Sequence, residues 1–164
     1  MNTRLITRLQ AIQADRLRRM YPAGRGDPQA RRYARAWVRI IGSGLLPRRW
    51  VVLEVPGRHT GRPTRFPLGM ADLDGRWYLV SMLGECNWVK NVRAAGYRAT
   101  LCRRRARDCR LMEVPADQRA PVLRRYLQKV PGGRPHIPIS ADASLTAFGA
   151  IAVRYPVFRV EAIA

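Results

Sequence analysis

The sequence predicts a small α+β barrel of antiparallel strands, with flanking helices at both ends of the chain. About five or six short segments have the apolar spacing of strands, and an Asp-Gly pair joins two of them as a hairpin. The longer helical patterns lie towards the two ends of the chain, so strands and helices do not alternate as in a parallel α/β fold. At 164 residues and 47% hydrophobic content, the chain suits one domain with a real core.

We predict a single domain, residues 1–164, made of three stretches. Residues 1–49 form N-terminal helices, and residues 50–114 form the barrel core with its basic loop. Residues 115–164 form C-terminal helices and the closing strand.

The first predicted helix covers residues 3–20 and is amphipathic. Leu5, Leu9 and Ile12 recur at helical spacing, with arginines on either side of the stripe. Such a stripe packs against a core in many soluble proteins. A basic amphipathic helix can also lie on an anionic membrane, which would add a peripheral membrane contact. The sequence leaves both interpretations open.

A second helix is predicted from Asp27 and Pro28, an N-cap and first-position pair, to about residue 41. Its expected buried stripe consists of Tyr33, Trp37, Ile40 and Ile41.

The barrel core begins with three predicted antiparallel strands at residues 51–55, 64–72 and 76–81. Asp74-Gly75 joins the last two, because a type I′ turn needs positive φ at both central positions. A short helix is expected at residues 87–96, with Asn87 as its N-cap and Gly96 just past its end.

Two more strands are predicted at residues 97–103 and 107–114, joined by an arginine-rich turn. We expect this turn to be an exposed hairpin tip, and a phosphate-binding patch is the alternative. A helix follows at residues 117–130, and Asp142 is expected to cap a short helix that ends at Ile151. Residues 155–163 supply the closing strand. The helix at 117–130 is expected to bury Leu123, Tyr126, Leu127 and Val130.

The chain is strongly basic, with a formal net charge of +20 from 31 basic and 11 acidic residues. Such a surplus indicates a polyanionic ligand, nucleic acid or anionic lipid. The arginines are spread along the whole chain and no recognition helix stands out, so we predict no specific nucleic-acid partner.

The three cysteines, Cys86, Cys102 and Cys109, lack the spacing of a metal site or a disulfide framework. No metal is therefore predicted, and the cysteine usage suits a reducing compartment. No apolar run approaches the roughly 18 residues of a membrane span, and the N-terminus does not resemble a signal peptide. We expect a cytoplasmic protein that is either free or peripheral to the membrane.

The loop between the first two strands is basic and bracketed by Gly57 and Gly61. Backbone amides in a glycine-bounded turn can form an anion-binding concavity, and guanidinium groups match phosphate geometry. Arg58, His59, Thr60 and Arg65 are the candidate ligands. The alternative is a hairpin loop whose glycines serve only its shape. Dinucleotide, P-loop and hydrolase motifs are absent from the sequence, so a bound cofactor is expected to carry the chemistry.

Three motifs make the chain similar to a known family. Gly57-Arg58-His59-Thr60-Gly61, Arg65-Phe66-Pro67-Leu68 and Trp88-x-x-Asn91 resemble the deazaflavin-dependent nitroreductase family. Members of that family are split β-barrels, Greek-key antiparallel barrels related to flavin reductases, and they use reduced coenzyme F-420.

The resemblance implies where the coenzyme lies. Its phosphate and oligoglutamate tail would lie over Arg58, His59, Thr60, Gly61 and Arg65. Its deazaflavin ring would lie near Phe66, Pro67, Ser81, Trp88 and Asn91, with Ser81 as the catalytic candidate that polarises the acceptor. The chain departs from the family at Met82, where a lysine is usual, and at His59, where lysine or arginine is usual.

By this resemblance the protein is an oxidoreductase that transfers a hydride from reduced coenzyme F-420 to a small polarised substrate. A quinone, an activated enone or a nitro-aromatic compound is the expected acceptor. The alternatives are a flavin mononucleotide (FMN) oxidoreductase or a non-catalytic ligand carrier on the same barrel, and a nucleic-acid-binding module. A homodimer is left open.

Overall fold

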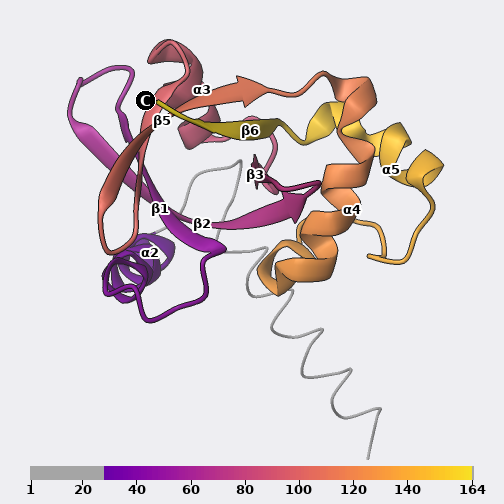
Figure 1. Ribbon diagram of the computed structural model, residues 1–164, viewed down its shortest axis with the longest axis horizontal. Helices are drawn as coiled ribbons and strands as arrows, with labels where there is room; N and C mark the ends of the chain where they lie inside the picture. Colours follow the sequence, from indigo (N-terminus) through magenta and orange to yellow (C-terminus); the bar gives the residue numbers. More distant parts are fainter. Residues whose placement is uncertain (1–27, 164) are drawn as a thin grey trace, which may run out of the picture.

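The computed structural model describes residues 28–163, and six antiparallel strands in this part of the chain form a closed barrel (Figure 1). Around the barrel the strands run β1-β2-β3-β6-β5-β4, and β4 pairs with β1 to close it. The predicted α+β barrel is confirmed. The strands are β1 (Trp50–Pro56), β2 (Pro63–Leu73), β3 (Arg76–Val80), β4 (Arg98–Cys102), β5 (Ala106–Glu113) and β6 (Val157–Ala162).

Helices precede the first strand, connect β3 to β4, and connect β5 to β6. The α-helices are α2 (Pro28–Gly42), α3 (Asn87–Ala94), α4 (Ala120–Lys129) and α5 (Leu145–Ile151), and the short 3-10 helices are η2 (Ala116–Gln118), η3 (Pro131–Gly133) and η4 (Ala152–Arg154). No helix among residues 28–163 is long and apolar enough to cross a membrane. The helix predicted at residues 3–20, with its proposed membrane contact, lies outside the described residues.

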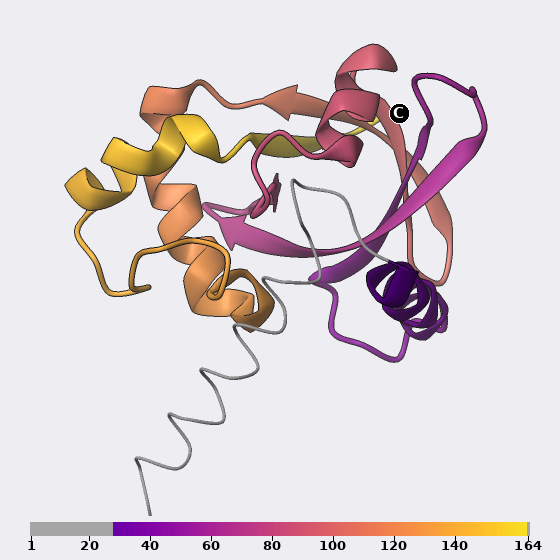
Figure 2. The same ribbon diagram turned by 180° about the vertical axis from the view of Figure 1, so that it is seen from behind.

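The antiparallel pairing gives the barrel two distinct ends. The β1–β2 loop and α3, which connects β3 to β4, lie at one end, here called the α3 end. By the strand pairing, the β2–β3 turn, the β4–β5 turn and the C-terminal end of β6 belong to the other, here called the far end. Figures 1 and 2 show the β4–β5 turn beside α2.

Two apolar clusters follow from the alternation of side chains along the strands. The first fills the barrel and includes Leu53, Leu79, Leu111 and Phe158, all with no exposed surface. α3 contributes Trp88, Val89 and Val92 to it, so this helix closes its end of the barrel.

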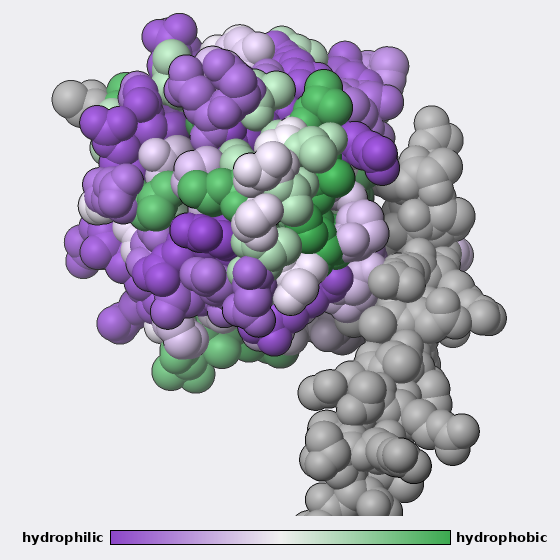
Figure 3. Space-filling model, turned by 90° about the vertical axis from the view of Figure 1, so that its right-hand side faces the viewer, coloured by the Kyte–Doolittle hydropathy of each residue, from purple (hydrophilic) through white to green (hydrophobic). Residues whose placement is uncertain are grey.

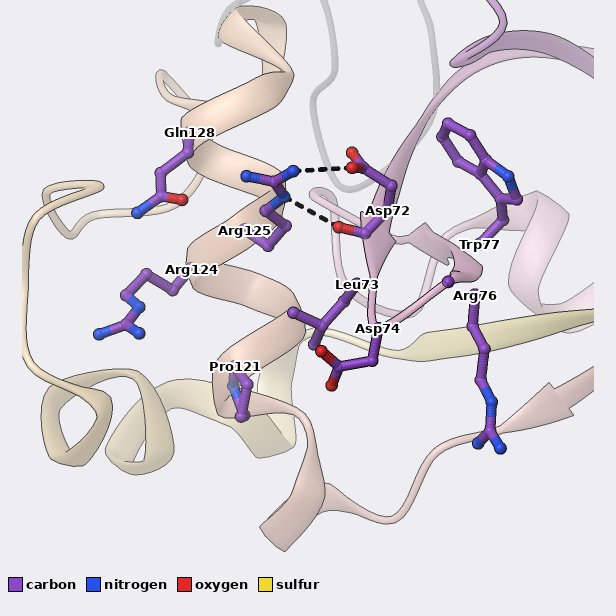
Figure 4. A pocket seen from close by; sticks show the side chains of 10 residues that line it. Asp72, Leu73, Asp74, Arg76, Trp77, Pro121, Arg124, Arg125 and Gln128 are labelled. Carbon is purple, nitrogen blue, oxygen red and sulfur yellow. Dashed lines mark hydrogen bonds and ion pairs between the residues drawn. The ribbon is translucent and has the colours of Figure 1, made fainter.

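The second cluster lies outside β2, β3 and β6, where α4 and α5 cover the sheet. The predicted face of α4, Leu123, Tyr126, Leu127 and Val130, is buried there. Figure 3 shows the outer side of these helices, where hydrophilic side chains surround smaller hydrophobic areas. Arg125 also ties α4 to β2, because its Nη2 lies 2.7 Å from Asp72 Oδ2 and its Nε donates to the Asp72 carbonyl (Figure 4).

The turn chemistry is as predicted at two positions. Asp74 and Gly75 have φ values of 50° and 72°, which is the backbone of the expected hairpin turn. Gly96 has φ 62° just after α3, and the Tyr97 and Gly96 amides donate to the carbonyls of Val92 and Arg93. This pattern is the Schellman motif that glycine favours at a helix end.

Some local predictions were wrong. Asn87 is the first residue of α3, and Cys86 occupies the N-cap position without a side-chain hydrogen bond. Ser144, not Asp142, caps α5, because its hydroxyl accepts from the Ala147 amide at 3.2 Å. Among the α2 side chains that the structure describes, only Ile41 is fully buried, whereas Tyr33 and Ile40 are 51% and 47% exposed.

Candidate functional site

The β1–β2 loop, residues 57–62, lies at the α3 end and is held by its own backbone. The Gly57 amide donates to the Arg62 carbonyl and the Gly61 amide to the Gly57 carbonyl, each at 2.8 Å, and the Thr60 amide donates to the Gly57 carbonyl at 3.2 Å. Gly61 has φ 66°, a conformation that favours glycine. These amides are used inside the loop, so an anion here must be bound mainly by side chains. This differs from the amide concavity that the glycine spacing suggested.

Arg58 reaches from this loop to two asparagines of α3. Its Nη1 donates to Asn91 Oδ1 at 2.9 Å, and its backbone amide donates to the same oxygen at 3.3 Å. Nη1 and Nη2 also lie 3.5 and 3.4 Å from Asn87 Oδ1. Both acceptors are neutral amides, so the guanidinium is held in place while its positive charge remains uncompensated by these two residues.

Asn91 is buried, with 4% of its surface exposed, and it joins three elements. Its Oδ1 accepts from Arg58, and its Nδ2 donates to Thr64 Oγ1 at 3.3 Å. Thr64 Oγ1 in turn donates to the Val55 carbonyl at 2.6 Å. Asn91 therefore fixes α3, the loop and the start of β2 relative to one another.

Arg65, unlike Arg58, is paired with a carboxylate. Its Nε lies 2.6 Å from Glu54 Oε2, its cross-strand partner on β1. The Glu54 hydrogen bond and charge raise the pKa of Arg65, although the side chain is 61% exposed. An anion at Arg65 would have to compete with this carboxylate.

The remaining loop side chains face solvent. His59 and Thr60 are exposed, and Thr60 Oγ1 accepts from the Arg62 amide at 3.3 Å. Arg62 is exposed as well. Among residues 28–163, Glu54 is the only ion-pair partner of the three arginines of this region, Arg58, Arg62 and Arg65.

The residues predicted near the ring do not share one face. Phe66 packs against the cluster inside the barrel. Pro67, the next residue of β2, is half-buried and lies on the outer face, because successive strand side chains point to opposite faces. A ring on the outer face of β2 would therefore contact Pro67 and not the Phe66 side chain.

Trp88 and Ser81 are both buried in this structure. Trp88 is 5% exposed and its ring centroid lies 5.4 Å from that of Phe158, inside the barrel core. Ser81 has no exposed surface, its hydroxyl donates to the Gly84 carbonyl at 2.5 Å, and it lies 3.2 Å from Cys86 Sγ. Ser81 therefore holds the segment between β3 and α3, and its catalytic role stays a prediction.

Two residues that contact Arg58 or Asn91 were not predicted as site residues from the sequence. Asn87 was read only as a helix cap and Thr64 only as a strand residue, yet both take part in the Arg58–Asn91 arrangement. The spacing of Asn87 and Asn91 was the available signal, because residues four apart on a helix lie on the same side.

An ionic network anchors the other side of α3. Arg93 contacts both Glu85 oxygens at 2.6 and 3.0 Å and both Glu113 oxygens at 2.9 and 2.7 Å. The nearly buried Arg119 lies 3.3 Å from Glu113 and donates to the Val114 carbonyl. The Arg93 hydrogen bond is the main reason that the pKa of Glu113 is lowered. The network ties α3 to β5 and so supports the position of Asn87 and Asn91.

The comparisons with known proteins agree with this architecture. Residues 28–136 match the family model described as F-420H(2)-dependent quinone reductase. The chain belongs to this family. It is therefore an oxidoreductase of the coenzyme F-420-dependent kind. A comparison with curated proteins found no match.

Solved structures show the split-barrel fold shared with the family. A protein of unknown function from Agrobacterium tumefaciens aligns with a TM-score of 0.54 at 12% identity, over 77% of this chain and 54% of that one. A conserved hypothetical protein from Mycobacterium tuberculosis aligns with a TM-score of 0.52 at 14% identity, over 77% and 80% of the two chains. A putative 5-nitroimidazole antibiotic resistance protein from Bacteroides thetaiotaomicron aligns with a TM-score of 0.50 at 12% identity, over 77% of this chain and 80% of that one.

The residues of the β1–β2 loop fit the coenzyme of this family. Coenzyme F-420 carries a phosphate and an oligoglutamate tail, both anionic. Within the described part of the chain the Arg58 guanidinium is positioned by amide oxygens, which leaves its charge available for such a group.

Proposed function

We propose that the protein transfers a hydride from reduced coenzyme F-420 to a quinone, an activated enone or a nitro-aromatic compound. Family membership supports the coenzyme, and the anchoring of Arg58 by Asn87 and Asn91 is the structural observation that carries the proposed site. When bound, the reduced coenzyme supplies the hydride, and the chain supplies binding and orientation.

Arg58 is the main ligand of the anionic tail in this proposal. A guanidinium that is already fixed loses little conformational entropy when it binds a phosphate or carboxylate. His59, Thr60 and Arg65 complete the tail site from the exposed side of the loop and the start of β2. Arg65 contributes less than Arg58 because Glu54 offsets its charge.

The ring is proposed to lie on the outer face of β2 at Pro67, beside the segment that Ser81 holds. Trp88 and Phe66 shape this region from inside the barrel, where they support the strands and α3. Hydride transfer needs donor and acceptor held about 3–3.5 Å apart, so a rigid wall behind the ring serves the reaction. The described residues contain no cluster of side chains that could hold a metal ion.

The test is a titration of the purified protein with coenzyme F-420 and with FMN, followed by intrinsic tryptophan fluorescence. Turnover is measured as the oxidation of the reduced coenzyme with a quinone, an enone and a nitro-aromatic compound offered separately. We expect binding of coenzyme F-420 in preference to FMN and turnover with at least one acceptor class. Binding of FMN alone, or no oxidation with any acceptor, would refute the proposal. A homodimer stays a prediction that gel filtration with light scattering can check.

A further inference from the structure

Three aromatic side chains form a ladder that runs from α2 to β1, which lie beside each other in both views (Figures 1 and 2). The Tyr33 and Trp37 rings, four residues apart on α2, meet edge to face with their centroids 6.1 Å apart. The Trp37 and Trp50 rings are stacked, with 5.9 Å between their centroids and 29° between their planes. Tyr33 is 51% exposed, whereas Trp37 and Trp50 are half-buried, so the ladder reaches from solvent to the barrel wall.

Trp50 is a close neighbour of Pro67 on the outer face of the sheet. It packs against the apolar cluster outside the sheet, so its ring points away from the barrel interior. In the antiparallel register Trp50 pairs with Gly69, and Val52 pairs with Pro67. Trp50 and Pro67 are therefore diagonal neighbours, about 7–8 Å apart, which is a separation that aromatic side chains span.

Gly69 brings the Trp50 ring close to the backbone of β2. A Cβ atom at this position would lie 3.2 Å from Trp50 Cζ3 and 2.7 Å from Val130 Cγ1, which is closer than side chains normally pack. A glycine within a strand often marks such a close approach. Trp50 is therefore fixed between β2 and Trp37, and the stacked pair is already in place before any ligand binds.

The ladder borders the place where hydride transfer is proposed to occur. This inference rests on the proposed function, in which the coenzyme ring lies on the outer face of β2 at Pro67. Donor and acceptor must approach to about 3–3.5 Å, so an acceptor at the ring is also within reach of the ladder. A hydride acceptor is electron-poor, and a flat electron-poor ring stacks favourably on the electron-rich face of an indole.

We propose that Trp37 is a specificity-determining residue of the acceptor site, which selects flat conjugated ring systems, quinones and nitro-aromatic compounds, over non-planar enones. Trp37 provides the stacking face, Trp50 supports it from β1, and Tyr33 borders it on the solvent side. A tryptophan side chain offers a large contact area and loses little conformational entropy, because it has only two rotatable torsions. Trp37 binds and orients the acceptor and exchanges no atom or electron with it.

The kinetic experiment offers two acceptors to the wild type, Trp37→Leu and Trp37→Phe. One is 2,3-dimethyl-1,4-naphthoquinone, which is flat and whose substituted ring resists addition of the free cysteine thiols. The other is 2-cyclohexen-1-one, a non-planar enone. In Trp37→Leu we expect at least a tenfold higher KM for the naphthoquinone, or about 1.4 kcal/mol of binding, and less than a twofold change for the enone.

The expected effect is on KM and not on kcat. Trp37 contributes binding that is the same in the ground state and the transition state, so kcat should change by less than twofold. Trp37→Phe should recover part of the affinity for the naphthoquinone, because it keeps a smaller aromatic face.

Trp77→Leu is the matched control. Trp77 is also a half-buried tryptophan, but it pairs with Asp72 near the β2–β3 turn, and its ring centroid lies 5.8 Å from the Arg48 guanidinium carbon. We expect this variant to keep the KM of both acceptors within twofold of the wild type. An equal rise in the naphthoquinone KM in Trp37→Leu and Trp77→Leu, or the same factor for both acceptors in Trp37→Leu, would overturn the proposal. Thermal melts check that each variant is folded, and Trp37→Phe carries the same comparison if Trp37→Leu is not.

A calorimetric titration gives a second readout that needs no turnover. The naphthoquinone is titrated into each variant in the presence of oxidised coenzyme F-420, which cannot deliver a hydride. We expect at least tenfold weaker naphthoquinone binding in Trp37→Leu and an unchanged affinity for the coenzyme. Equal naphthoquinone affinity in the wild type and Trp37→Leu would overturn the proposal. A loss of coenzyme affinity in its place would do so too, because the ladder would then contact the coenzyme ring and not the acceptor.

Failure of this inference is distinguishable from failure of the proposed function. If only the inference is wrong, every folded variant still binds coenzyme F-420 and oxidises its reduced form with an unchanged preference between the two acceptors. If the proposed function is wrong, the wild type itself binds no coenzyme F-420 or reduces neither acceptor, and both proposals are overturned.

Discussion

The buried side-chain oxygen of Asn91 accepts two hydrogen bonds from Arg58, one from the guanidinium at 2.9 Å and one from the backbone amide at 3.3 Å. An amide oxygen directs the guanidinium without neutralising it, whereas a carboxylate would do both. Asn91 thus holds the Arg58 guanidinium in a fixed position and leaves its positive charge available to a ligand.

Asn91→Asp tests this combination. The carboxylate should keep Arg58 in place but offset its charge, so we expect weaker binding of coenzyme F-420. It also removes the Nδ2 donor to Thr64, so fold stability should fall as well. Losing a charge-assisted contact of about 1.5–3 kcal/mol corresponds to roughly ten- to hundred-fold weaker binding. Fluorescence titration and thermal unfolding measure the two effects. Unchanged affinity would show that the Arg58 charge does not serve the coenzyme.

Replacing Arg58 itself should cost more than replacing Arg65. We expect Arg58→Ala to weaken coenzyme binding by roughly ten- to hundred-fold, and Arg65→Ala to weaken it less because Glu54 already offsets that charge. Arg58→Lys should recover only part, because a point charge cannot reproduce the guanidinium fork. Arg110→Ala, an exposed arginine of β5, is the control. Equal losses in all the arginine variants would mean that diffuse charge holds the ligand.

Glu54→Gln addresses the competition at Arg65. Removing the carboxylate frees the Arg65 guanidinium, so the affinity for the anionic coenzyme should rise several-fold at low salt, and less at physiological salt where exposed charges are screened. Glu161→Gln removes one negative charge at the C-terminal end of β6, where Glu161 pairs with Arg159, and serves as control. The same gain in both variants would argue for net charge over a local effect.

The fold was predictable because its signals are local. The Asp74-Gly75 turn, Gly96 and the alternating strands each require only a few neighbouring residues, and all were found in the structure. The site was less predictable because its contacts are long-range. Nothing near Arg58 in the sequence shows that Asn91 holds it, and nothing near Arg65 shows that Glu54 pairs with it. The burial of Ser81 and Trp88 likewise depends on how α3 closes the barrel, which is also a long-range arrangement.

Acid should weaken the fold through Glu113. Arg93 holds the pKa of this carboxyl below its ordinary value of about 4.3. A lowered folded-state pKa contributes stability above the ordinary value, and that contribution is lost as the pH falls through the folded-state value. The pair is partly exposed, so the effect is about 1 kcal/mol or less.

Denaturant unfolding between neutral pH and about pH 3 measures this effect. Glu113→Gln and Arg93→Gln should each lower stability at neutral pH and lose less of it on acidification than the wild type does. If both variants lose as much unfolding free energy on acidification as the wild type does, the Arg93–Glu113 pair does not contribute to the acid sensitivity of the fold.

Ser81→Ala separates a structural from a catalytic role. The hydroxyl is buried and donates to the Gly84 carbonyl, so its removal should lower the free energy of unfolding by about 0.5–1.5 kcal/mol. If Ser81 acts only by holding the segment between β3 and α3, kcat at saturating coenzyme should change by less than about threefold, or about 0.65 kcal/mol in the barrier. Steady-state kinetics with the best acceptor and chemical denaturation give both quantities. A fall in kcat of a hundred-fold with unchanged stability would instead place the hydroxyl at the acceptor, and would require this segment to open when the coenzyme binds.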